Sequence, residues 1–383
     1  MIGVAILGVG DIANVHIEAY QRLSDRCEIR ALVNRHTDKA EEKKKKYGLD
    51  AKVYGDYHEI LGRDDIQLVS VCLPPAMHCE VTVGCLEAGK HVLCEKPMAP
   101  TLEECDAMIA AAKQGGVILS CVAQNRFKQD IMRTKQLLES GAIGKPLFAQ
   151  ANSLWWRGNH YYDLWWRGTW EKEGGGCTLI HAVHHIDLLL WMMGNVKSVC
   201  SLVANQSHTG SEVEDVSIST IRFENGAVGT LVSSLLHHGE GQQFVIDAEK
   251  GTIEIPHKIA VSRQLANGYP EADEDACRTL KAQFAALPEL SYTEHCGQIE
   301  NVLKAIETGT VPLIGGADGR RTVEFISGVY QSAFFGKPTV FPMTKKDAFY
   351  TRAGILKHAT RFYKKEKSVE NLADLGISVG GTL

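Results

Sequence analysis

Residues 2–13 read IGVAILGVGDIA and decide the fold of the first part of the chain. The apolar run 2–7 predicts a buried strand, and the helical pattern after it places the glycines in the turn between strand and helix. Gly8 allows a tight turn, Gly10 lets the backbone approach a pyrophosphate, and Ala13 lets helix and strand pack closely. A plain glycine turn is the alternative, but this context favours a dinucleotide-binding turn. Its candidate cofactor-binding residues are Gly8, Gly10, Asp11 and Ile12.

The residues after this turn continue to alternate short apolar runs with helical patterns up to about residue 125. Continuous apolar strands between helices indicate a parallel sheet that is covered on both faces. Right-handed crossovers then give a doubly wound α/β sheet of the Rossmann type, and we assign residues 1–125 to this domain. The expected strands are 2–7, 28–33, 66–73, 91–94 and 117–123, and the expected helices are 15–23, 37–47, 83–88 and 102–114.

The pattern changes in residues 126–383, which we assign to a second, substrate-binding and oligomerisation domain. Here strands follow one another through turns, and Glu-Asn-Gly at 224–226 is a strong hairpin signal. Such strands predict an antiparallel sheet. Residues 264–288 show no clear period and are expected to form a surface excursion. The expected strands are 147–154, 196–204, 216–223, 228–235, 244–247 and 252–255, and the expected helices are 129–140, 179–193 and 297–308.

The composition argues against several classes of protein. The 383 residues carry 41 Lys and Arg against 46 Asp and Glu, and this formal charge of −5 argues against a nucleic-acid binder. No apolar run approaches the ~18 residues of a membrane span, and the first residues already read as a strand, so we expect neither a membrane segment nor a secretory signal. The 11 cysteines include no C-x-x-C pair and read as reduced thiols of a cytoplasmic protein.

The end of the second predicted strand bears on the choice of dinucleotide. An acidic residue normally binds the adenosine ribose at this place, but the chain has Asn34 there. Asn34 can still bond a ribose hydroxyl, whereas Arg35 or Lys39 could meet a 2′-phosphate. We therefore expect NAD as the cofactor, and NADP is not excluded.

Side chains suited to acid–base chemistry occur in two places. Lys96, in Glu-Lys-Pro at the carboxyl end of strand 91–94, would face the cofactor crevice, with a surface lysine as the alternative. Farther along, His181, His184 and His185 fall within one arc of ~100° on the expected helix. Because no third distant ligand is evident, we expect no metal and one histidine that acts as acid or base.

Five of the six tryptophans lie between Trp155 and Trp170, among arginine, glycine and asparagine residues. The cluster has neither helical nor strand period and therefore reads as a loop or an edge. Aromatic faces beside hydrogen-bonding side chains suit a sugar ring. An oligomer interface is an equally good interpretation, and both could hold. The candidate substrate-binding residues are Trp156, His160, Tyr161, Trp166, Arg167 and His185.

Several motifs stand together along the chain: 8–13 (Gly-Val-Gly-Asp-Ile-Ala), 74–78 (Pro-Pro-Ala-Met-His), 88–92 (Ala-Gly-Lys-His-Val), 95–97 (Glu-Lys-Pro), 174–187, 223–226, 309–322 and 336–338. In this set the chain resembles the Gfo/Idh/MocA oxidoreductases, a family named for glucose–fructose oxidoreductase and inositol dehydrogenase. Glu-Lys-Pro after an Ala-Gly-Lys-His-Val strand is the most specific part of the match, which covers all but the last part of the chain.

The resemblance implies an N-terminal Rossmann domain and a C-terminal α/β domain with a large, open, mostly antiparallel sheet. This sheet often mediates oligomerisation, so we expect a homodimer or homotetramer. On the matching motifs, the candidate cofactor-binding residues are Pro74, His78, Glu95 and Lys96.

The resemblance also implies catalytic residues. It places Lys96 near the reacting hydroxyl and makes His184 the catalytic histidine. Many members carry Asp or Asn four residues before that histidine, where this chain has Ile180. Either His184 acts with Lys96 alone, or His181 takes part as well.

These expectations favour an NAD(P)-dependent oxidoreductase that transfers a hydride to or from a hydroxyl-bearing carbon of a sugar, polyol or glycoside. One alternative is an NAD-dependent glycosidase that works by transient oxidation to a 3-keto sugar, elimination, hydration and re-reduction. Another is a non-enzymatic dinucleotide-binding sensor, which Ile180 favours and the presence of Lys96 and His184 disfavours. The expected partner is a small carbohydrate.

Overall fold

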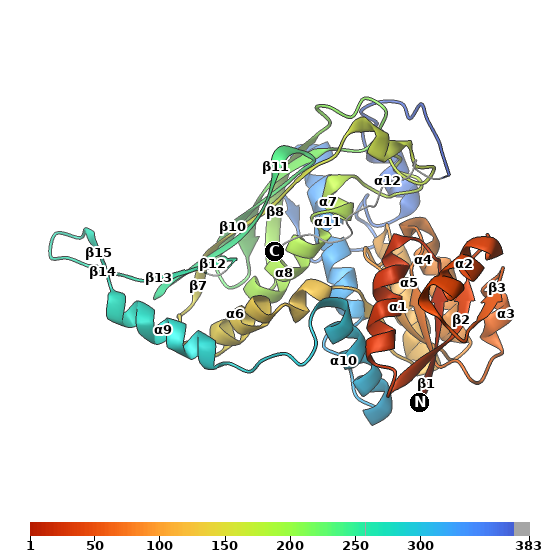
Figure 1. Cartoon of the computed structure of the whole chain (residues 1–383). Helices are drawn as coiled ribbons and strands as arrows, with labels where there is room; N and C mark the ends of the chain where they lie inside the picture. Colours follow the sequence, from red (N-terminus) through yellow and green to blue (C-terminus); the bar gives the residue numbers. More distant parts are fainter. Residues whose placement is uncertain (257, 371–383) are drawn as a thin grey trace.

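The computed structural model describes residues 1–256 and 258–370 (Figure 1). Its first part is a sheet of six parallel strands in the order β3-β2-β1-β4-β5-β6, which confirms the predicted Rossmann fold. The sheet comprises β1 (Ile2–Leu7), β2 (Cys27–Val33), β3 (Lys52–Tyr54), β4 (Leu68–Val71), β5 (His91–Cys94) and β6 (Leu119–Cys121). Its helices are α1 (Asp11–Arg22), α2 (Thr37–Tyr47), α3 (His58–Leu61), α4 (His78–Glu87) and α5 (Leu102–Gly115).

Both faces of this sheet are buried, which explains why β1 is apolar without alternation. Ala5 and Leu7 belong to a core that includes residues of α4 and α5. Val4 and Ile6 belong to a second core with residues of α1 and of α10 (Glu294–Thr308). Helix α10 belongs to the second half of the chain. The second half therefore contributes one of the helices that cover the first sheet (Figure 1).

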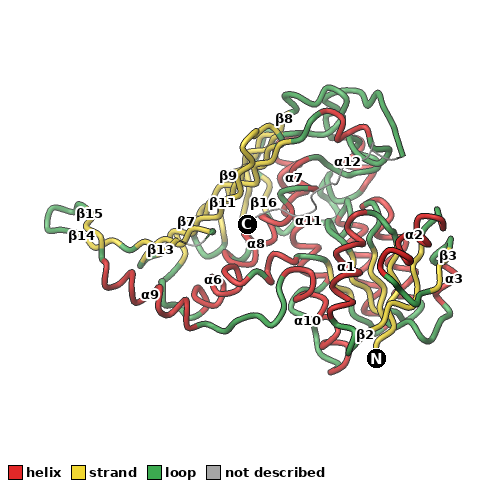
Figure 2. Tube along the Cα trace, in the orientation of Figure 1, coloured by secondary structure: helices red, strands yellow, loops and turns green. Residues whose placement is uncertain are grey.

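The second sheet has eight strands in the order β13-β12-β11-β7-β10-β9-β8-β16. β7 and β10 pair in parallel and every other neighbouring pair is antiparallel, so the expected mostly antiparallel sheet is confirmed. In Figure 2 its strands form a long slab that leads to the small hairpin β14–β15. The strands are β7 (Pro146–Trp156), β8 (Val196–Ala204), β9 (Val216–Phe223), β10 (Val228–Ser234), β11 (Leu236–Ala248), β12 (Gly251–Ile255), β13 (Lys258–Ala260), β14 (Ser262–Gln264), β15 (Pro270–Ala272) and β16 (Thr339–Val340).

Helices cover one face of the large sheet, where α7, α8 and α11 contact its strands. α11 also packs against α5 and β6 of the first sheet and so lies between the two halves (Figure 1). Among the described residues, none of the helices combines the length and the hydropathy that crossing a membrane requires. The remaining helices are α6 (Gln129–Glu139), α7 (Cys177–Ile180), α8 (Val183–Met193), α9 (Glu274–Ala286), α11 (Gly316–Phe335) and α12 (Arg352–His358).

Some sequence-based expectations for individual elements were wrong. The single helix expected over 179–193 is broken at His181 and Ala182, where α7 ends and α8 begins. The stretch 264–288, expected to form a surface excursion, is largely exposed, but it contains the thirteen-residue helix α9, which the sequence analysis did not predict. The sequence reading also missed α11, which contains three glycines within the helical pattern, and the short strand β3.

Candidate active site

The glycine turn after β1 has the shape that a dinucleotide pyrophosphate requires. Gly8 has φ +90°, and a Cβ there would lie 2.4 Å from the carbonyl oxygen of Cys72, so only glycine fits. A Cβ on Gly10 would meet no atom within 4 Å, which means that this residue faces open space. Gly10 caps α1 without a side-chain hydrogen bond, so the helix presents backbone N–H groups to that space. These features fit a bound dinucleotide phosphate.

A cation beside this turn escaped the sequence analysis. Lys43 of α2 donates to the carbonyl oxygen of Gly10 at 3.2 Å and to Oδ1 of Asn14 at 2.7 Å. Burial lowers the Lys43 pKa, which Asp11 partly offsets. Lys43 lies in a run of four lysines, which is typical of a solvated helix face. The sequence therefore did not indicate its contact with the glycine turn.

The residues expected to meet the adenosine ribose follow β2. The Asn34 amide nitrogen donates to the carbonyl oxygen of His36 at 2.8 Å, so its amide oxygen is the atom that could accept from a ribose hydroxyl. Arg35 is exposed and lies 3.4 Å from Glu370. At this edge the amide oxygen of Asn34 could therefore bind the hydroxyl of an unphosphorylated ribose. The side chain of Arg35 is exposed to solvent beside it.

His78 and Pro74 follow the loop after β4. The His78 ring is fully buried, and its nitrogens lie 2.9 Å from the carbonyl oxygen of Pro97 and 2.7 Å from that of Leu73. Pro74 begins the short turn that leads into α4. His78 thus holds two backbone loops together, and any contribution to cofactor binding would act through those loops.

Lys96 and His184 line the same cavity, although they come from different halves of the chain. Lys96 follows β5, and its peptide bond to Pro97 is cis. Its ammonium group donates to the carbonyl oxygen of Ile180 at 3.5 Å, just before the break between α7 and α8. The structure therefore brings the predicted lysine and histidine together. The other lining residues are Met98, Cys121, Val122, Ala123, Val183, Asp187, Ile314, Gly319, Thr322 and Val323.

The electrostatics of this pair suit proton transfer. Burial holds the pKa of His184 well below its usual value, and the positive charge of Lys96 lowers it further, so the imidazole is neutral at pH 7. Burial also lowers the pKa of Lys96, whereas the neighbouring Glu95 carboxylate raises it. A neutral imidazole beside an ammonium group provides a proton acceptor and an oxyanion partner.

His181 lies at the helix break and contacts the aromatic loop. Its Nε2 is 3.3 Å from the Tyr161 hydroxyl, and Arg167 donates to that same hydroxyl. Arg167 also pairs with the buried carboxylate of Glu173 at 3.1 Å. Burial, then Arg167, holds the pKa of His181 well below its usual value. The guanidinium of Arg167 stacks on Trp166, 4.0 Å from the ring centre. Three predicted substrate residues, Tyr161, Arg167 and Trp166, thus form a chain of contacts that starts at His181.

The other three predicted substrate residues have different surroundings. Trp156 is exposed beside His238, and His160 is exposed and pairs with Asp163. His185 is buried, and neither of its ring nitrogens has a hydrogen-bond partner among the described residues. Burial lowers its pKa to about 3. Within the described part of the chain, none of these three forms a hydrogen bond, ion pair or ring contact with His181.

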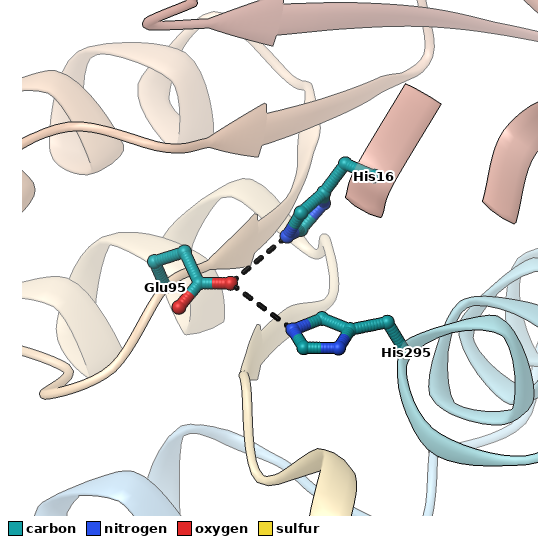
Figure 3. Close-up of side chains that lie close together, drawn as sticks. All are labelled: His16, Glu95 and His295. Carbon is teal, nitrogen blue, oxygen red and sulfur yellow. Dashed lines mark hydrogen bonds and ion pairs between the residues drawn. The ribbon is translucent and has the colours of Figure 1, made fainter. Parts of the chain in front are cut away.

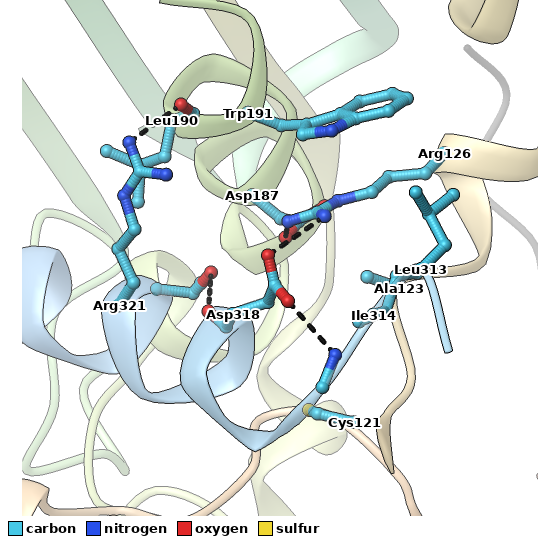
Figure 4. Close-up of polar contacts among 12 residues, drawn as sticks. Cys121, Ala123, Arg126, Asp187, Leu190, Trp191, Leu313, Ile314, Asp318 and Arg321 are labelled. Carbon is cyan, nitrogen blue, oxygen red and sulfur yellow. Dashed lines mark hydrogen bonds and ion pairs between the residues drawn. The ribbon is translucent and has the colours of Figure 1, made fainter. Parts of the chain in front are cut away.

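A buried ion-pair network anchors α8 one turn after His184 (Figure 4). Arg126 donates from Nε and Nη2 to the two oxygens of Asp187, at 2.8 and 2.6 Å. Its Nη1 donates to Asp318 at 3.0 Å, and its guanidinium lies over the ring of Trp191. Because Arg126 follows β6 and Asp318 begins α11, the network fixes α8 against both.

Family models match two parts of the chain. Residues 2–122 match the oxidoreductase family with an NAD-binding Rossmann fold, and residues 131–254 match the GFO/IDH/MocA C-terminal domain. The N-terminal match includes the glycine turn and Glu95-Lys96-Pro97, and the C-terminal match includes the aromatic loop and His184.

Individual relatives span most of the chain. Myo-inositol 2-dehydrogenase of Thermotoga maritima is 27% identical over 325 residues, which cover 83% of this chain and 92% of the relative. Levoglucosan dehydrogenase of Pseudarthrobacter phenanthrenivorans is 26% identical over 311 residues, covering 73% and 80%. The WlbA dehydrogenase of Bordetella pertussis, solved with NADH and UDP-GlcNAcA, is 25% identical and superimposes with a TM-score of 0.76 over 90% of this chain and 99% of that one. The chain belongs to the Gfo/Idh/MocA oxidoreductase family.

Proposed function

We propose that this chain is an NAD-dependent oxidoreductase that transfers a hydride to or from a hydroxyl-bearing carbon of a sugar or polyol. The observation that carries the proposal is that Lys96 and His184 line one cavity at the carboxyl end of β5. In a doubly wound sheet this end is where ligands bind. The named relatives support the substrate class. Two are dehydrogenases of myo-inositol and of levoglucosan, and the third is a dehydrogenase solved in complex with UDP-GlcNAcA.

The chain's own residues would divide the chemistry as follows. The turn at Gly8 and Gly10, with Lys43 beside it, would hold the dinucleotide, and bound NAD supplies the hydride acceptor. His184, neutral because it is buried, would take the hydroxyl proton of the substrate. The ammonium group of Lys96 would donate a hydrogen bond to the same oxygen and stabilise the developing alkoxide.

The region around Ile180 supports a role for His181. The side chain of Ile180 cannot replace the carboxylate or amide that many relatives carry at this position. The carbonyl oxygen of Ile180 nevertheless accepts a hydrogen bond from Lys96. The next residue, His181, is bonded to Tyr161. This arrangement extends the polar site from Lys96 toward the aromatic loop, where Arg167 and Trp166 offer a charged edge and a flat ring to a sugar.

The two alternatives receive less support. The glycosidase hypothesis needs oxidation and re-reduction in one active site, and the relatives named above are dehydrogenases. The sensor hypothesis gives no reason for a lysine and a neutral histidine to line one cavity. Oxidoreductase chemistry uses both residues.

We also propose a homodimer or homotetramer that forms through the open face of the large sheet. Leu202, Ile218, Val228 and Val340 are exposed, and the strand register puts them on one face. Exposed apolar side chains grouped in this way favour association with a second copy. A cytoplasmic location fits the cysteines, all of which are free and nine of which are buried.

The test is a turnover assay with NAD and a panel of sugars and polyols that includes myo-inositol and levoglucosan, followed by nicotinamide absorbance. We expect turnover on at least one compound and its loss in Lys96→Ala. Lys90→Ala is the matched control, because Lys90 precedes the opposite end of β5 and donates to the carbonyl oxygen of Arg63. Equal activity of the two variants, or no turnover of the panel, would count against the proposal.

A further inference from the structure

Three side chains from distant parts of the chain converge at Glu95, the residue before Lys96 (Figure 3). His16 comes from α1, Glu95 follows β5, and His295 lies in the first turn of α10. Oε1 of Glu95 accepts from His16 Nε2 at 2.9 Å and lies 3.5 Å from His295 Nε2. We call these three residues the Glu95 cluster. The carboxylate of Glu95, which the sequence analysis predicted for the cofactor site, faces these two histidines.

The Glu95 cluster is buried and its polar atoms are connected. The side chains of His16, Glu95 and His295 are 0%, 6% and 12% exposed. His16 Nδ1 lies 3.2 Å from the hydroxyl of Ser70, which bonds the hydroxyl of Tyr20. Burial alone would lower the His16 pKa, but Cys72 and Glu95 raise it to about 10. Despite burial, bonds from the two histidines hold the Glu95 pKa well below its usual value. The cluster therefore contains an ionised carboxylate at neutral pH.

The second oxygen of Glu95 points to the function of the Glu95 cluster. Oε2 accepts from the backbone N–H of Lys96 at 3.2 Å. The carboxylate thus accepts a hydrogen bond from His16 on one oxygen, which His295 also faces at 3.5 Å, and accepts the backbone N–H of Lys96 on the other. Because the ammonium contact of Lys96 with Ile180 is long, at 3.5 Å, the placement of this side chain depends on its backbone.

We propose that His16 and His295 are positioning residues, which hold the Glu95 carboxylate so that it fixes the backbone from which Lys96 reaches the substrate. The inference rests on the proposed function, because it takes Lys96 as the group that contacts the reacting oxygen. Since α1 carries Gly10 at its N-terminus, the same contacts tie the dinucleotide turn to Lys96. The contact of His295 with Glu95 comes from α10, which belongs to the second half of the chain and packs on α1.

His295 offers the sharpest test, because two amide side chains of different length can replace it. The amide nitrogen of glutamine can occupy the place of Nε2, whereas that of asparagine occupies the place of Nδ1 and falls short of Glu95. Both are polar and smaller than histidine, so their effects on folding should be alike. The exposed histidine His58, which pairs with Asp56 at 2.7 Å, supplies the control His58→Asn.

Turnover, the KM of the sugar and the affinity for NAD are measured for each variant. We expect His295→Asn to lower kcat by about tenfold or more, as small displacements of a catalytic group do. The KM of the sugar and the Kd of NAD should stay within about threefold, because the proposed role of the cluster is to place Lys96 and not to bind either ligand. His295→Gln should recover most of the kcat, and His58→Asn should match the wild type. His16→Gln, made from the other side of the cluster, should retain more activity than His16→Asn.

Three results would overturn the inference. Wild-type kcat in His295→Asn would show that the contact does not position Lys96. A loss of NAD affinity at unchanged kcat would make the Glu95 cluster part of the cofactor site. Stoichiometric zinc or manganese in the purified protein, removed by a chelator together with activity, would make the three side chains metal ligands. The proposed function fails separately, when the wild type itself shows no turnover or Lys96→Ala retains it.

Discussion

Replacing Asp187 by Asn removes the negative charge that faces the buried guanidinium of Arg126. Nε and Nη2 of Arg126 now donate to two carboxylate oxygens, and the side chains are 3% and 7% exposed. An asparagine keeps one oxygen but presents an NH₂ group to the other donor. Arg126 then retains only the bond from Nη1 to Asp318 as a full charge pair.

The magnitude follows from burial. Removing one partner of a buried ion pair costs about 3–5 kcal/mol of folding free energy, because the other charge is left without compensation. Asp318 remains 3.0 Å from Arg126 and is 29% exposed, so part of the compensation survives. We therefore expect Asp187→Asn to lower the free energy of unfolding by about 3 kcal/mol, at the lower end of that range.

Urea denaturation of the purified protein measures this change, with Glu271→Gln as the control. Arg263 and Glu271 form a pair of similar length, 2.7 Å, whose side chains are 63% and 46% exposed. An exposed pair contributes about 1 kcal/mol at most. Equal destabilisation by the two variants would refute the argument that burial makes the Asp187 contact important. Because Asp187 lies one turn after His184, turnover should fall in Asp187→Asn and not in Glu271→Gln.

Three further predictions concern the site itself. His184→Ala should lower turnover by about a hundredfold, measured with saturating NAD and sugar; if His181→Ala is as damaging, the two histidines act together, and if only His181→Ala is damaging, the base has been misassigned. In a pH series of kcat/KM for sugar oxidation, the fall in rate on the acid side should lie below pH 6.5. The base works in its neutral form, which is populated above its pKa in the folded protein, and burial holds the His184 pKa well below 6.5. A fall that begins above pH 6.5 would contradict this assignment. Gly10→Val should fold, because a Cβ there meets no atom within 4 Å, yet its side chain should fill the pyrophosphate space and abolish NAD binding by titration, whereas wild-type affinity would place the phosphates elsewhere.

The sequence predicted the first sheet well because its strands are local signals. The short runs that become β1, β4 and β5 are almost wholly buried, which is typical of strands covered on both faces. β3 has three residues and none is buried, so it has no comparable signal. α11 is buried around much of its surface, and its glycines interrupt the helical pattern from which an amphipathic helix is recognised.

The candidate site divides in the same way. Lys96 and His184 could be proposed from the sequence because Lys96 stands in Glu-Lys-Pro after an expected strand and His184 stands in the motif at 174–187. The contact of Glu95 with His295 spans 200 positions of the chain, and a single sequence carries no signal for such a pairing. The break between α7 and α8 also could not be predicted, because residues 177–193 contain neither glycine nor proline to mark it.

The most direct test of the central claim uses a sugar or polyol substrate deuterated at the carbon that is oxidised. The protein is incubated with this substrate and excess NAD, and the NADH formed is counted and analysed by mass spectrometry. The account predicts many NADH molecules per protein chain, each carrying the deuterium, and the loss of this product in Lys96→Ala. Unlabelled NADH, or no more than one NADH per chain while the substrate is consumed, would contradict direct net hydride transfer from the sugar.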